Sequence, residues 1–269
     1  MIELYENQLK NFERQSSKGN QLKWQHDNSW YKADYAGYEG LAEYVVSKLL
    51  SKSNLKPEEF VDYELEQIKY KRNTFNGVKS KDFLSDDWQI ITLERLYKTK
   101  KNTSLLQAVW KHENIDDRVC FLVDEVIKLT GIEDFGIYLS KMLTIDTFFL
   151  NEDRHMHNIA VLMNSEGRYK LCPIFDNGAA LLSDTVLDYP MGADVLDMID
   201  EVKSKTICTD FDMQLDSVEK ILGYNIKFNF TKKDVDIVLE KQDVYTAEIV
   251  ERVRTILYQR IRKFQYLFS

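Results

Sequence analysis

The chain has 269 residues, of which 44% are hydrophobic and 30% are charged, a composition typical of a folded globular protein and not of a disordered one. Its 44 acidic residues outnumber its 36 basic residues, and the formal net charge of −8 argues against a broad nucleic-acid-binding surface or attraction to anionic membranes. Three scattered cysteines, without a leader sequence or an apolar run of about 20 residues, indicate a cytoplasmic protein, with export left open.

The first predicted elements are a polar turn and two strands. Residues 16–24 read as a turn of small polar residues that enters a strand, and backbone N–H groups in such a turn can cover phosphates. The candidates for this contact are Ser17, Lys18 and Gly19. The second strand, Trp30–Asp34, follows a turn at residues 27–29, and alternation directs Lys32 away from its neighbours on either side.

A helix is predicted from Leu41 to Leu50 by the spacing of its apolar residues. It contains Glu43, and we predict an ion pair between Glu43 and Lys32 that aims the lysine at nucleotide phosphates. Glu39, four residues earlier on the same helical face, stays open as an alternative partner. Taken singly, each of these charges is more often a solvated surface residue, and only their joint position ahead of Asp153 favours a functional pair.

The remaining pattern predicts an α+β protein. Strands are expected at residues 60–65 and 90–96, with a hairpin-like turn around Asn76 and Gly77. Helical periodicity begins after residue 104, and helices are expected near residues 105–110, 119–127, 139–149, 212–222, 232–241 and 245–267. We therefore predict two lobes, a small β-rich lobe (1–97) and a mainly helical lobe (98–269). The motif spacing described in the next paragraph predicts that these lobes form a fold of the protein-kinase type.

The most informative segment lies between residues 150 and 178. Asp153 is placed to accept a hydrogen bond from an incoming hydroxyl as a general base, and Asn158, five residues on, to bind Mg²⁺ through its side-chain carbonyl. After a predicted hairpin, Asp176 supplies a charged metal ligand, and Gly178 gives the backbone beyond it extra freedom. This order of groups is what a phosphotransferase that uses ATP and Mg²⁺ requires.

Simpler interpretations exist for each of these residues. A single Asp-x-Gly or Asp-Arg-His is more often a turn than a site, so the spacing of the whole set is what counts. His155 and His157 raise the alternative of a zinc site, but no third ligand stands at a usual distance and Cys172 is alone in its strand. We assign His155 to the catalytic loop as a brace beside the base.

Residues 181–211 occupy the place of an activation or substrate loop. The hydroxyl residues considered as phosphoacceptors are Thr185, Ser204, Thr206 and Thr209. Loops are rich in hydroxyls, so we prefer to interpret all four as solvated side chains. Lys203 and Lys205 are available to pair with a phosphate.

Together these motifs resemble the HipA-type serine/threonine kinases, and within them the short, CtkA-type branch. The resemblance covers about residues 16–215, and only the combination is specific: Ser-x-Gly-x-Gln-x-Lys at 17–23, the Lys32 strand, the Glu43 helix, the strand 90–96 and the motifs at Asp153 and Asp176. Autophosphorylation in such kinases falls on serines of the phosphate loop, and the matching positions here are Ser16 and Ser17.

The resemblance also implies roles for the site residues. Asp153 would be the catalytic base, Asn158 and Asp176 would bind Mg²⁺, and Lys32 would contact the phosphates of ATP. Backbone groups of Glu94 and Leu96 would meet adenine at the hinge between the lobes.

The expected partner is a protein substrate that offers a Ser or Thr hydroxyl. Full-length HipA toxins carry a further N-terminal subdomain that helps to bind an antitoxin, and this sequence starts almost directly at the phosphate loop. This difference argues against a toxin role with a HipB-like DNA-binding partner, and a small helix-turn-helix antitoxin-like partner is kept only as an open alternative. The Asp176 and Asp153 motifs are also similar to those of phosphatidylinositol kinases, so a lipid or small-molecule kinase is one alternative. A pseudokinase that binds nucleotide without turnover is another.

Overall fold

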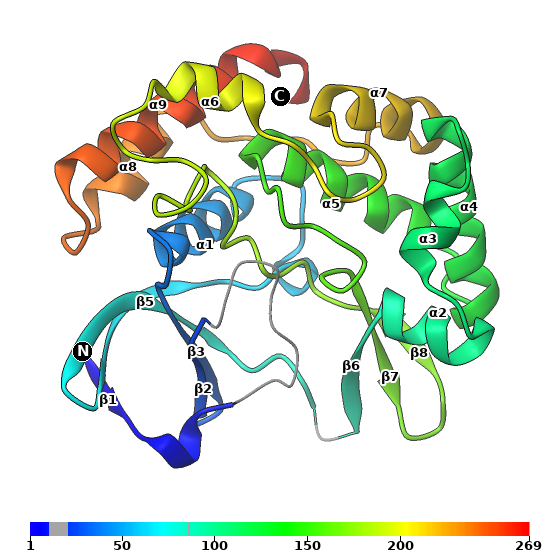
Figure 1. Ribbon diagram of the computed structural model, residues 1–269, viewed down its shortest axis with the longest axis horizontal. Coiled ribbons are helices and arrows are strands. Elements are labelled where there is room, and N and C mark those ends of the chain that lie inside the picture. The colour runs from blue at the N-terminus through cyan, green and yellow to red at the C-terminus, as the bar shows by residue number, and fades with distance from the viewer. Residues whose placement is uncertain (11–20, 86, 269) are drawn as a thin grey trace. The chain divides into compact units, whose positions relative to one another are not determined.

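The computed structural model describes residues 1–10, 21–85 and 87–268 (Figure 1). The chain forms two compact units, each assembled from separate stretches of sequence. Unit 1 comprises residues 1–83, 175–202 and 227–269, and unit 2 comprises residues 84–174 and 203–226. The predicted lobe boundary at residue 97 stays a prediction.

Unit 1 is built on a five-stranded sheet with the strand order β1-β4-β5-β3-β2 (Figure 1). β1 runs parallel to β4, and the other neighbours are antiparallel. The strands are β1 (Ile2–Leu4), β2 (Lys23–His26), β3 (Ser29–Ala33), β4 (Glu64–Tyr70) and β5 (Asn73–Lys81). Asp27 and Asn28 join β2 to β3 with φ angles of 47° and 58°, the left-handed conformation that a tight hairpin needs and that Asp and Asn tolerate.

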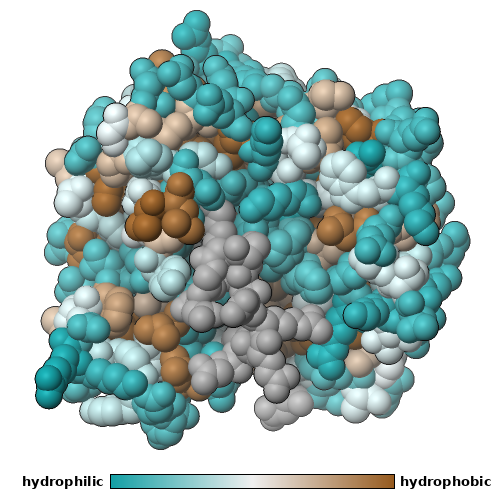
Figure 2. All heavy atoms as spheres, in the orientation of Figure 1, coloured by the Kyte–Doolittle hydropathy of each residue, from teal (hydrophilic) through white to brown (hydrophobic). Residues whose placement is uncertain are grey.

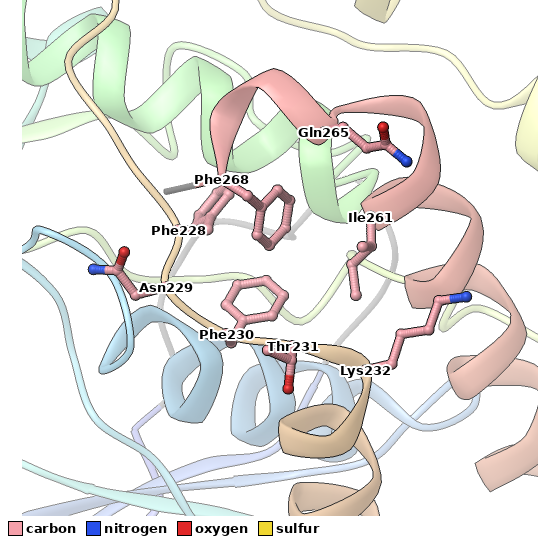
Figure 3. Close-up of a pocket in the computed structure, with 8 residues that line it drawn as sticks. All are labelled: Phe228, Asn229, Phe230, Thr231, Lys232, Ile261, Gln265 and Phe268. Carbon is pink, nitrogen blue, oxygen red and sulfur yellow. The ribbon is translucent and has the colours of Figure 1, made fainter.

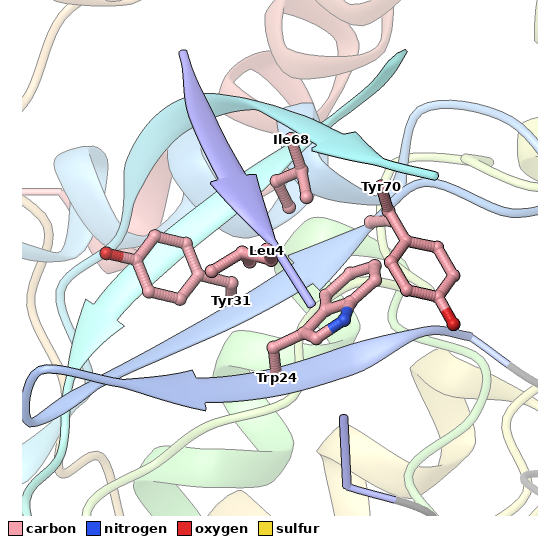
Figure 4. Close-up of a cluster of buried hydrophobic side chains, with 6 residues drawn as sticks. Leu4, Trp24, Tyr31, Ile68 and Tyr70 are labelled. Atoms are coloured by element: carbon pink, nitrogen blue, oxygen red, sulfur yellow. The ribbon is translucent and has the colours of Figure 1, made fainter. Parts of the chain in front are cut away.

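One face of this sheet carries a compact apolar cluster. Tyr31 and Ala33 of β3 point into it, as strand alternation predicts, while Lys32 between them points to the other face. The cluster comprises Leu4, Trp24, Tyr31, Ala33, Ile68 and Tyr70 (Figure 4). The rings of Trp24 and Tyr70 meet edge to face, with centroids 5.3 Å apart. This contact links the edge strand β2 to β4, although β3 and β5 lie between them in the sheet.

Helix α1 (Glu39–Leu50) packs on the face of the sheet to which Lys32 points. Gly40 permits this close approach of the helix to β5, and Gly77 permits close pairing of β5 with β3. A Cβ on Gly77 would lie 2.1 Å from the Lys32 carbonyl oxygen, and a Cβ on Gly40 would lie 2.8 Å from the Gly77 Cα. The predicted turn at Asn76 and Gly77 is therefore wrong: both lie inside β5, where the glycine serves packing, and the chain turns instead at Lys71, whose φ is 55°.

The rest of unit 1 is helical. Its further elements are α6 (Val195–Glu201), α8 (Lys232–Glu240), α9 (Ala247–Lys263) and the short 3₁₀ turns η1 (Glu6–Gln8), η2 (Pro57–Glu59) and η3 (Gln265–Leu267). Thr231 and Thr246 cap α8 and α9 by accepting hydrogen bonds from backbone N–H groups, which explains where both helices begin. The two predicted C-terminal helices are confirmed, whereas α6 lies in a segment that the sequence indicated as a loop.

Unit 2 combines a three-stranded antiparallel sheet, in the order β6-β7-β8, with five helices. The strands are β6 (Trp88–Thr92), β7 (Ala160–Asn164) and β8 (Tyr169–Leu171). The helices are α2 (Leu93–Lys101), α3 (Leu105–Trp110), α4 (Ile115–Thr130), α5 (Phe135–Phe149) and α7 (Phe211–Leu222). The predicted helices and the β7-β8 hairpin are confirmed. The predicted α+β class is confirmed as well.

The strand predicted over residues 90–96 is wrong in its second half. β6 ends at Thr92, and the Thr92 hydroxyl accepts a hydrogen bond from the backbone N–H of Arg95 at 3.3 Å, which starts α2. Leu, Glu and Arg favour helix once such a cap is present, and this local preference overrides the short apolar run that precedes it. None of the helices in the described ranges combines the length and apolar character that a membrane crossing requires.

Candidate active site

Lys32 is the centre of a partly buried charge cluster in unit 1. Its Nζ lies 2.5 Å from Glu43 Oε1 and 2.9 Å from Asp176 Oδ1, and the Glu43 side chain is 1% exposed. The second oxygen of Glu43 accepts a hydrogen bond from the backbone N–H of Asn177 at 2.9 Å. Glu43 therefore connects the lysine of β3 with the backbone of the Asp176 motif.

Glu39, the alternative partner of Lys32, has another function. Its carboxylate accepts hydrogen bonds from the backbone N–H groups of Tyr35, Ala36 and Gly37, at 3.3, 2.7 and 3.1 Å. These groups precede α1, so Glu39 stabilises the entry of the chain into the helix. The structure thus pairs Lys32 with Glu43.

The charges in this cluster support a permanently protonated lysine. Burial alone would lower the pKa of Lys32, but the carboxylates of Asp176 and Glu43 outweigh burial and hold the pKa well above its usual value. Tyr63 also contacts the ammonium group, and burial together with the charge of Glu43 raises the pKa of the Tyr63 hydroxyl. The cluster therefore consists of one cation, two carboxylates and one neutral hydroxyl.

The backbone of the Asp176 motif differs from the prediction. Asp176 itself adopts the left-handed conformation, with φ 63°, whereas Gly178 does not have a positive φ. A Cβ on Gly178 would lie 3.5 Å from the Glu39 Cβ, an ordinary contact distance. The expected role of Gly178 is therefore wrong, and the strained position is the carboxylate residue that faces Lys32.

The predicted catalytic loop in unit 2 begins where α5 ends. Leu150 terminates the helix in a left-handed conformation with φ 58°, an unfavourable geometry for a bulky residue. Arg154 then donates to both carboxylate oxygens of Asp146 at 2.9–3.2 Å, and the side chains of both residues are 1% exposed. Asn151 donates to the same carboxylate at 2.9 Å, so Asp146 fixes the loop to the last turn of α5.

Asp153 lies next to two basic side chains. Lys205 Nζ is 3.4 Å from Asp153 Oδ1, and His155 Nε2 is 3.9 Å from Asp153 Oδ2. The His155 Nδ1 atom accepts a hydrogen bond from the backbone N–H of His157 at 3.2 Å, which assigns the ring proton to the nitrogen that faces Asp153. This arrangement agrees with His155 as a brace of the loop.

Asn158 is oriented by the backbone of Asp153. Its side-chain Nδ2 donates to the Asp153 carbonyl oxygen at 2.8 Å. Because the amide nitrogen is used in this bond, the side-chain oxygen is the atom left to act as a ligand. Within the described residues, that oxygen accepts no hydrogen bond.

Two hydroxyls of the predicted activation segment are not solvated. Thr206 is fully buried and donates to the Arg154 carbonyl oxygen at 2.5 Å, and Ser204 donates to Gln214 Oε1 at 3.1 Å with 2% of its surface exposed. The interpretation of these two side chains as solvated is therefore wrong. They stabilise the chain on either side of Lys205 against the loop and α7.

The segment before α6 is held by a buried arginine of α9. Arg252 donates to the carbonyl oxygen of Tyr189 at 2.9 Å and is 6% exposed. The same segment exposes Val186 and Leu187, which retain 70% and 69% of their surface. Figure 2 shows a mostly hydrophilic face on which exposed hydrophobic residues, drawn in brown, form small separate groups. One of these groups lies over the loop that precedes α6.

The residues predicted to bind adenine and to form the phosphate loop do not belong to the two clusters described above. Glu94 and Leu96 lie in the first turn of α2 and not in a hinge strand, and the Glu94 backbone N–H already donates to the Met156 carbonyl oxygen at 3.1 Å. The predicted adenine contact through backbone groups of Glu94 and Leu96 stays a prediction. Ser16, Ser17, Lys18 and Gly19 lie outside the described residues, so the phosphate loop stays a prediction.

Three polar residues of these clusters were not predicted from the sequence. They are Tyr63, Asp146 and Arg154, the last as the ion-pair partner of Asp146. Lys205 was considered only as a partner for a phosphate, whereas the structure places it beside Asp153. Tyr63 carries no spacing signal relative to Lys32. A signal did exist for Asp146, because it falls on the same helical face as the apolar residues Leu139, Met142 and Phe149, where a charge needs a buried partner.

A surface pocket of about 300 Å³ lies elsewhere in unit 1, near the C-terminus (Figure 3). The walls include Phe228, Phe230, Ile261 and Phe268, with Lys232 and Gln265 at the edge. None of the candidate residues lines it. In the part of the chain that the structure describes, no three His, Cys, Asp or Glu side chains gather as a metal site, so the zinc alternative gains no support.

No family model and no curated protein matches the sequence. The fold, by contrast, is similar to that of the proinflammatory kinase CtkA of Helicobacter pylori, with a TM-score of 0.61 over 99% of this chain and 96% of that chain, at 18% identity. A chain of the HipA, HipB and operator DNA complex of Shewanella oneidensis MR-1 has a TM-score of 0.46 and 11% identity, over 89% of this chain and 59% of that chain. The second likeness is too weak to carry an argument. The chain therefore has the mixed α+β fold of the CtkA structure, which confirms the kinase-like fold that the sequence motifs predicted.

Proposed function

We propose that this protein is an ATP-dependent serine/threonine protein kinase. It transfers the γ-phosphate of Mg·ATP to a protein hydroxyl and also phosphorylates itself. The observation that carries this proposal is the partly buried cluster of Lys32, Glu43 and Asp176 in a chain with a kinase-like fold. A lysine held by a helical glutamate and by the carboxylate of the metal motif is the arrangement that phosphoryl transfer requires.

Each residue has a chemical role in this proposal. Lys32 donates to phosphate oxygens and offsets their negative charge, and Glu43 keeps its ammonium group in place. Asp153 accepts the proton of the substrate hydroxyl while the hydroxyl oxygen forms a bond to the γ-phosphorus and the bond to ADP breaks. Lys205 and His155 hold the Asp153 carboxylate in position.

In this proposal Asn158 and Asp176 would hold a magnesium ion, and the chemistry of each side chain suits that ion. Asn158 directs its side-chain oxygen away from the bond that fixes its amide nitrogen, and Asp176 supplies a carboxylate. One amide oxygen and one carboxylate are a donor set that Mg²⁺ accepts when phosphate oxygens and water complete its shell. The ion would neutralise phosphate charge during transfer.

A kinase that acts on a lipid or a small molecule is the second candidate, because it would use the same residues. The acidic net charge of −8 disfavours attraction to an anionic lipid surface. A pseudokinase is disfavoured by the presence of Asp153, Asn158 and Asp176 together. A cytoplasmic location and a small helix-turn-helix antitoxin-like partner belong to the proposal and await their own tests.

The experiment that tests the proposal is a transfer assay with γ-labelled ATP and Mg²⁺. The purified chain is incubated alone, with a mixture of proteins, with phosphoinositide vesicles and with small alcohols. Label on serine or threonine of this chain or of an added protein supports the proposal. Label only on lipid or small alcohols favours the second candidate, and label on no acceptor contradicts both.

A further inference from the structure

The Lys32 ammonium group has a third neighbour besides its two carboxylates. The Tyr63 hydroxyl accepts a hydrogen bond from Lys32 Nζ at 3.4 Å, and the centre of the Tyr63 ring lies 5.2 Å from the same nitrogen. An ammonium group has three N–H donors, so Glu43, Asp176 and Tyr63 together account for all three directions. At 3.4 Å this hydrogen bond is long and weak, so it orients the Lys32 ammonium group more than it stabilises it.

Tyr63 is fixed to the helix that carries Glu43. Its backbone N–H donates to the Ser47 hydroxyl at 3.1 Å, and that hydroxyl donates to the Tyr44 carbonyl oxygen at 3.0 Å. Ser47 is fully buried and lies four residues after Glu43, so both residues share one face of α1. The tyrosine and the glutamate therefore approach Lys32 from a single rigid support.

The hydroxyl suits this position because it is neutral. Two carboxylates already face one ammonium group, and a third anion in the same buried space would repel them. Burial and the charge of Glu43 raise the pKa of Tyr63, which keeps the phenol protonated. An acceptor without charge restrains the lysine and leaves the charge balance unchanged.

We propose that Tyr63 is a positioning residue for Lys32, and that its hydroxyl sets the direction in which the ammonium group meets the phosphates of a nucleotide. When a nucleotide enters, Lys32 must turn at least one N–H from its present partners toward a phosphate oxygen. The contact with Tyr63 limits the rotation of the Lys32 ammonium group, because one of its three N–H groups donates to the Tyr63 hydroxyl. The inference depends on the proposed kinase function.

The test uses Tyr63→Phe, which removes one oxygen and keeps the ring. We expect kcat/KM for ATP to fall about threefold to tenfold, the range for loss of one ordinary hydrogen bond, because the 3.4 Å contact is long, while the melting temperature stays close to that of wild type. The matched control is Tyr258→Phe on α9, whose hydroxyl donates to Asp236 at 2.8 Å, and this variant should keep wild-type kinetics.

A double-mutant cycle separates positioning from general packing. Affinity for Mg·ATP is measured for Tyr63→Phe, Lys32→Met and the double variant, and we expect Tyr63→Phe to have no further effect once Lys32 is absent. If Tyr63→Phe does not fold, Ser47→Ala, which releases the Tyr63 backbone, takes its place in the cycle.

The outcomes distinguish the inference from the proposed function. If the wild-type chain transfers phosphate but Tyr63→Phe matches it, or if the effects of Tyr63→Phe and Lys32→Met simply add, the positioning role is wrong and the kinase proposal stands. If wild type and Tyr258→Phe both bind no nucleotide and transfer no phosphate, the kinase proposal fails first.

Discussion

The carboxylate of Glu43 joins Lys32 to the backbone beside Asp176. One oxygen lies 2.5 Å from Lys32 Nζ, and the other accepts the Asn177 N–H at 2.9 Å. Both oxygens are therefore used in a side chain that is 1% exposed. Glu43 thus holds Lys32 and the backbone of the Asp176 motif in one arrangement.

Replacing Glu43 with Gln should weaken this arrangement. The amide cannot balance the Lys32 charge, so Asp176 is left as its only charged partner among the described residues. We expect kcat/KM for ATP to fall about tenfold to a hundredfold, measured from initial rates with labelled ATP. Glu64→Gln removes an exposed partner of Lys48 and serves as the control, with no expected change. Equal rates for wild type and Glu43→Gln would refute the role of the pair.

Lys205 should matter for the Asp153 carboxylate. Lys205→Met removes a partner at 3.4 Å from Asp153 Oδ1, and the lysine side chain is 42% exposed. A partly exposed pair is worth on the order of 1 kcal/mol, so we expect kcat to fall about fivefold with little change in KM for ATP. Lys203→Met is the matched control, since Lys203 is an exposed lysine two residues away. A loss of the same size in both variants would argue against a specific contact.

The ion pair between Asp146 and Arg154 should be essential for the stability of unit 2. Asp146→Asn leaves the Arg154 guanidinium buried without its charge partner, and breaking such a pair costs about 3–5 kcal/mol. Urea unfolding measures the free energy of unfolding directly. Asp116→Asn, which removes a surface partner of Lys220, should cost less than about 1 kcal/mol. Similar losses for both variants would contradict the structural role of the buried pair.

Stability should depend on pH through Asp34. Burial, followed by the charge of Glu39, raises the pKa of this carboxyl to about 7, while Gly40 N–H and the Tyr245 hydroxyl donate to it. The native state then binds a proton that the unfolded chain releases near pH 4, so the free energy of unfolding falls as the pH rises from about 4 to about 7.

Asp34→Asn cannot ionise and should lose this dependence. The free energy of unfolding of wild type should fall between about pH 5 and about pH 8, and that of the variant should not fall through this group. We expect this difference to be on the order of 2 kcal/mol, a modest value because the half-buried carboxyl keeps part of its hydration. Melting temperatures of both proteins at the two pH values give the difference. Identical pH profiles for wild type and variant would show that Asp34 is already ionised at low pH.

Much of the fold follows from periodicity in the sequence. The helices α3 to α5 and α7 to α9 have strong apolar spacing, and the β7-β8 hairpin has a clear turn at Gly167, whose φ is 77°. The errors arose where a local pattern was ambiguous. Gly77 looked like a turn residue but allows close packing of β5 on β3, and Thr92 caps a helix inside an apolar run.

The site was predictable only where spacing carries the signal. The Lys32 and Glu43 pair was expected from its place ahead of the Asp153 motif, and the structure contains it. Tyr63 could not be predicted, because its contact with Lys32 depends on how the segment before β4 lies along α1. Lys205 contacts Asp153 only because buried hydroxyls on both sides fix its segment, and no sequence pattern announces such burial.

The most direct test of the central claim is the rate of phosphate transfer from γ-labelled Mg·ATP by wild type and by Asp153→Asn. Asn keeps the size of the side chain but cannot accept the proton, so we expect transfer to fall by about 10²–10⁴-fold while ATP binding and melting temperature are retained. Transfer by Asp153→Asn at the wild-type rate would contradict the account, as would a wild-type protein that binds Mg·ATP but labels no acceptor.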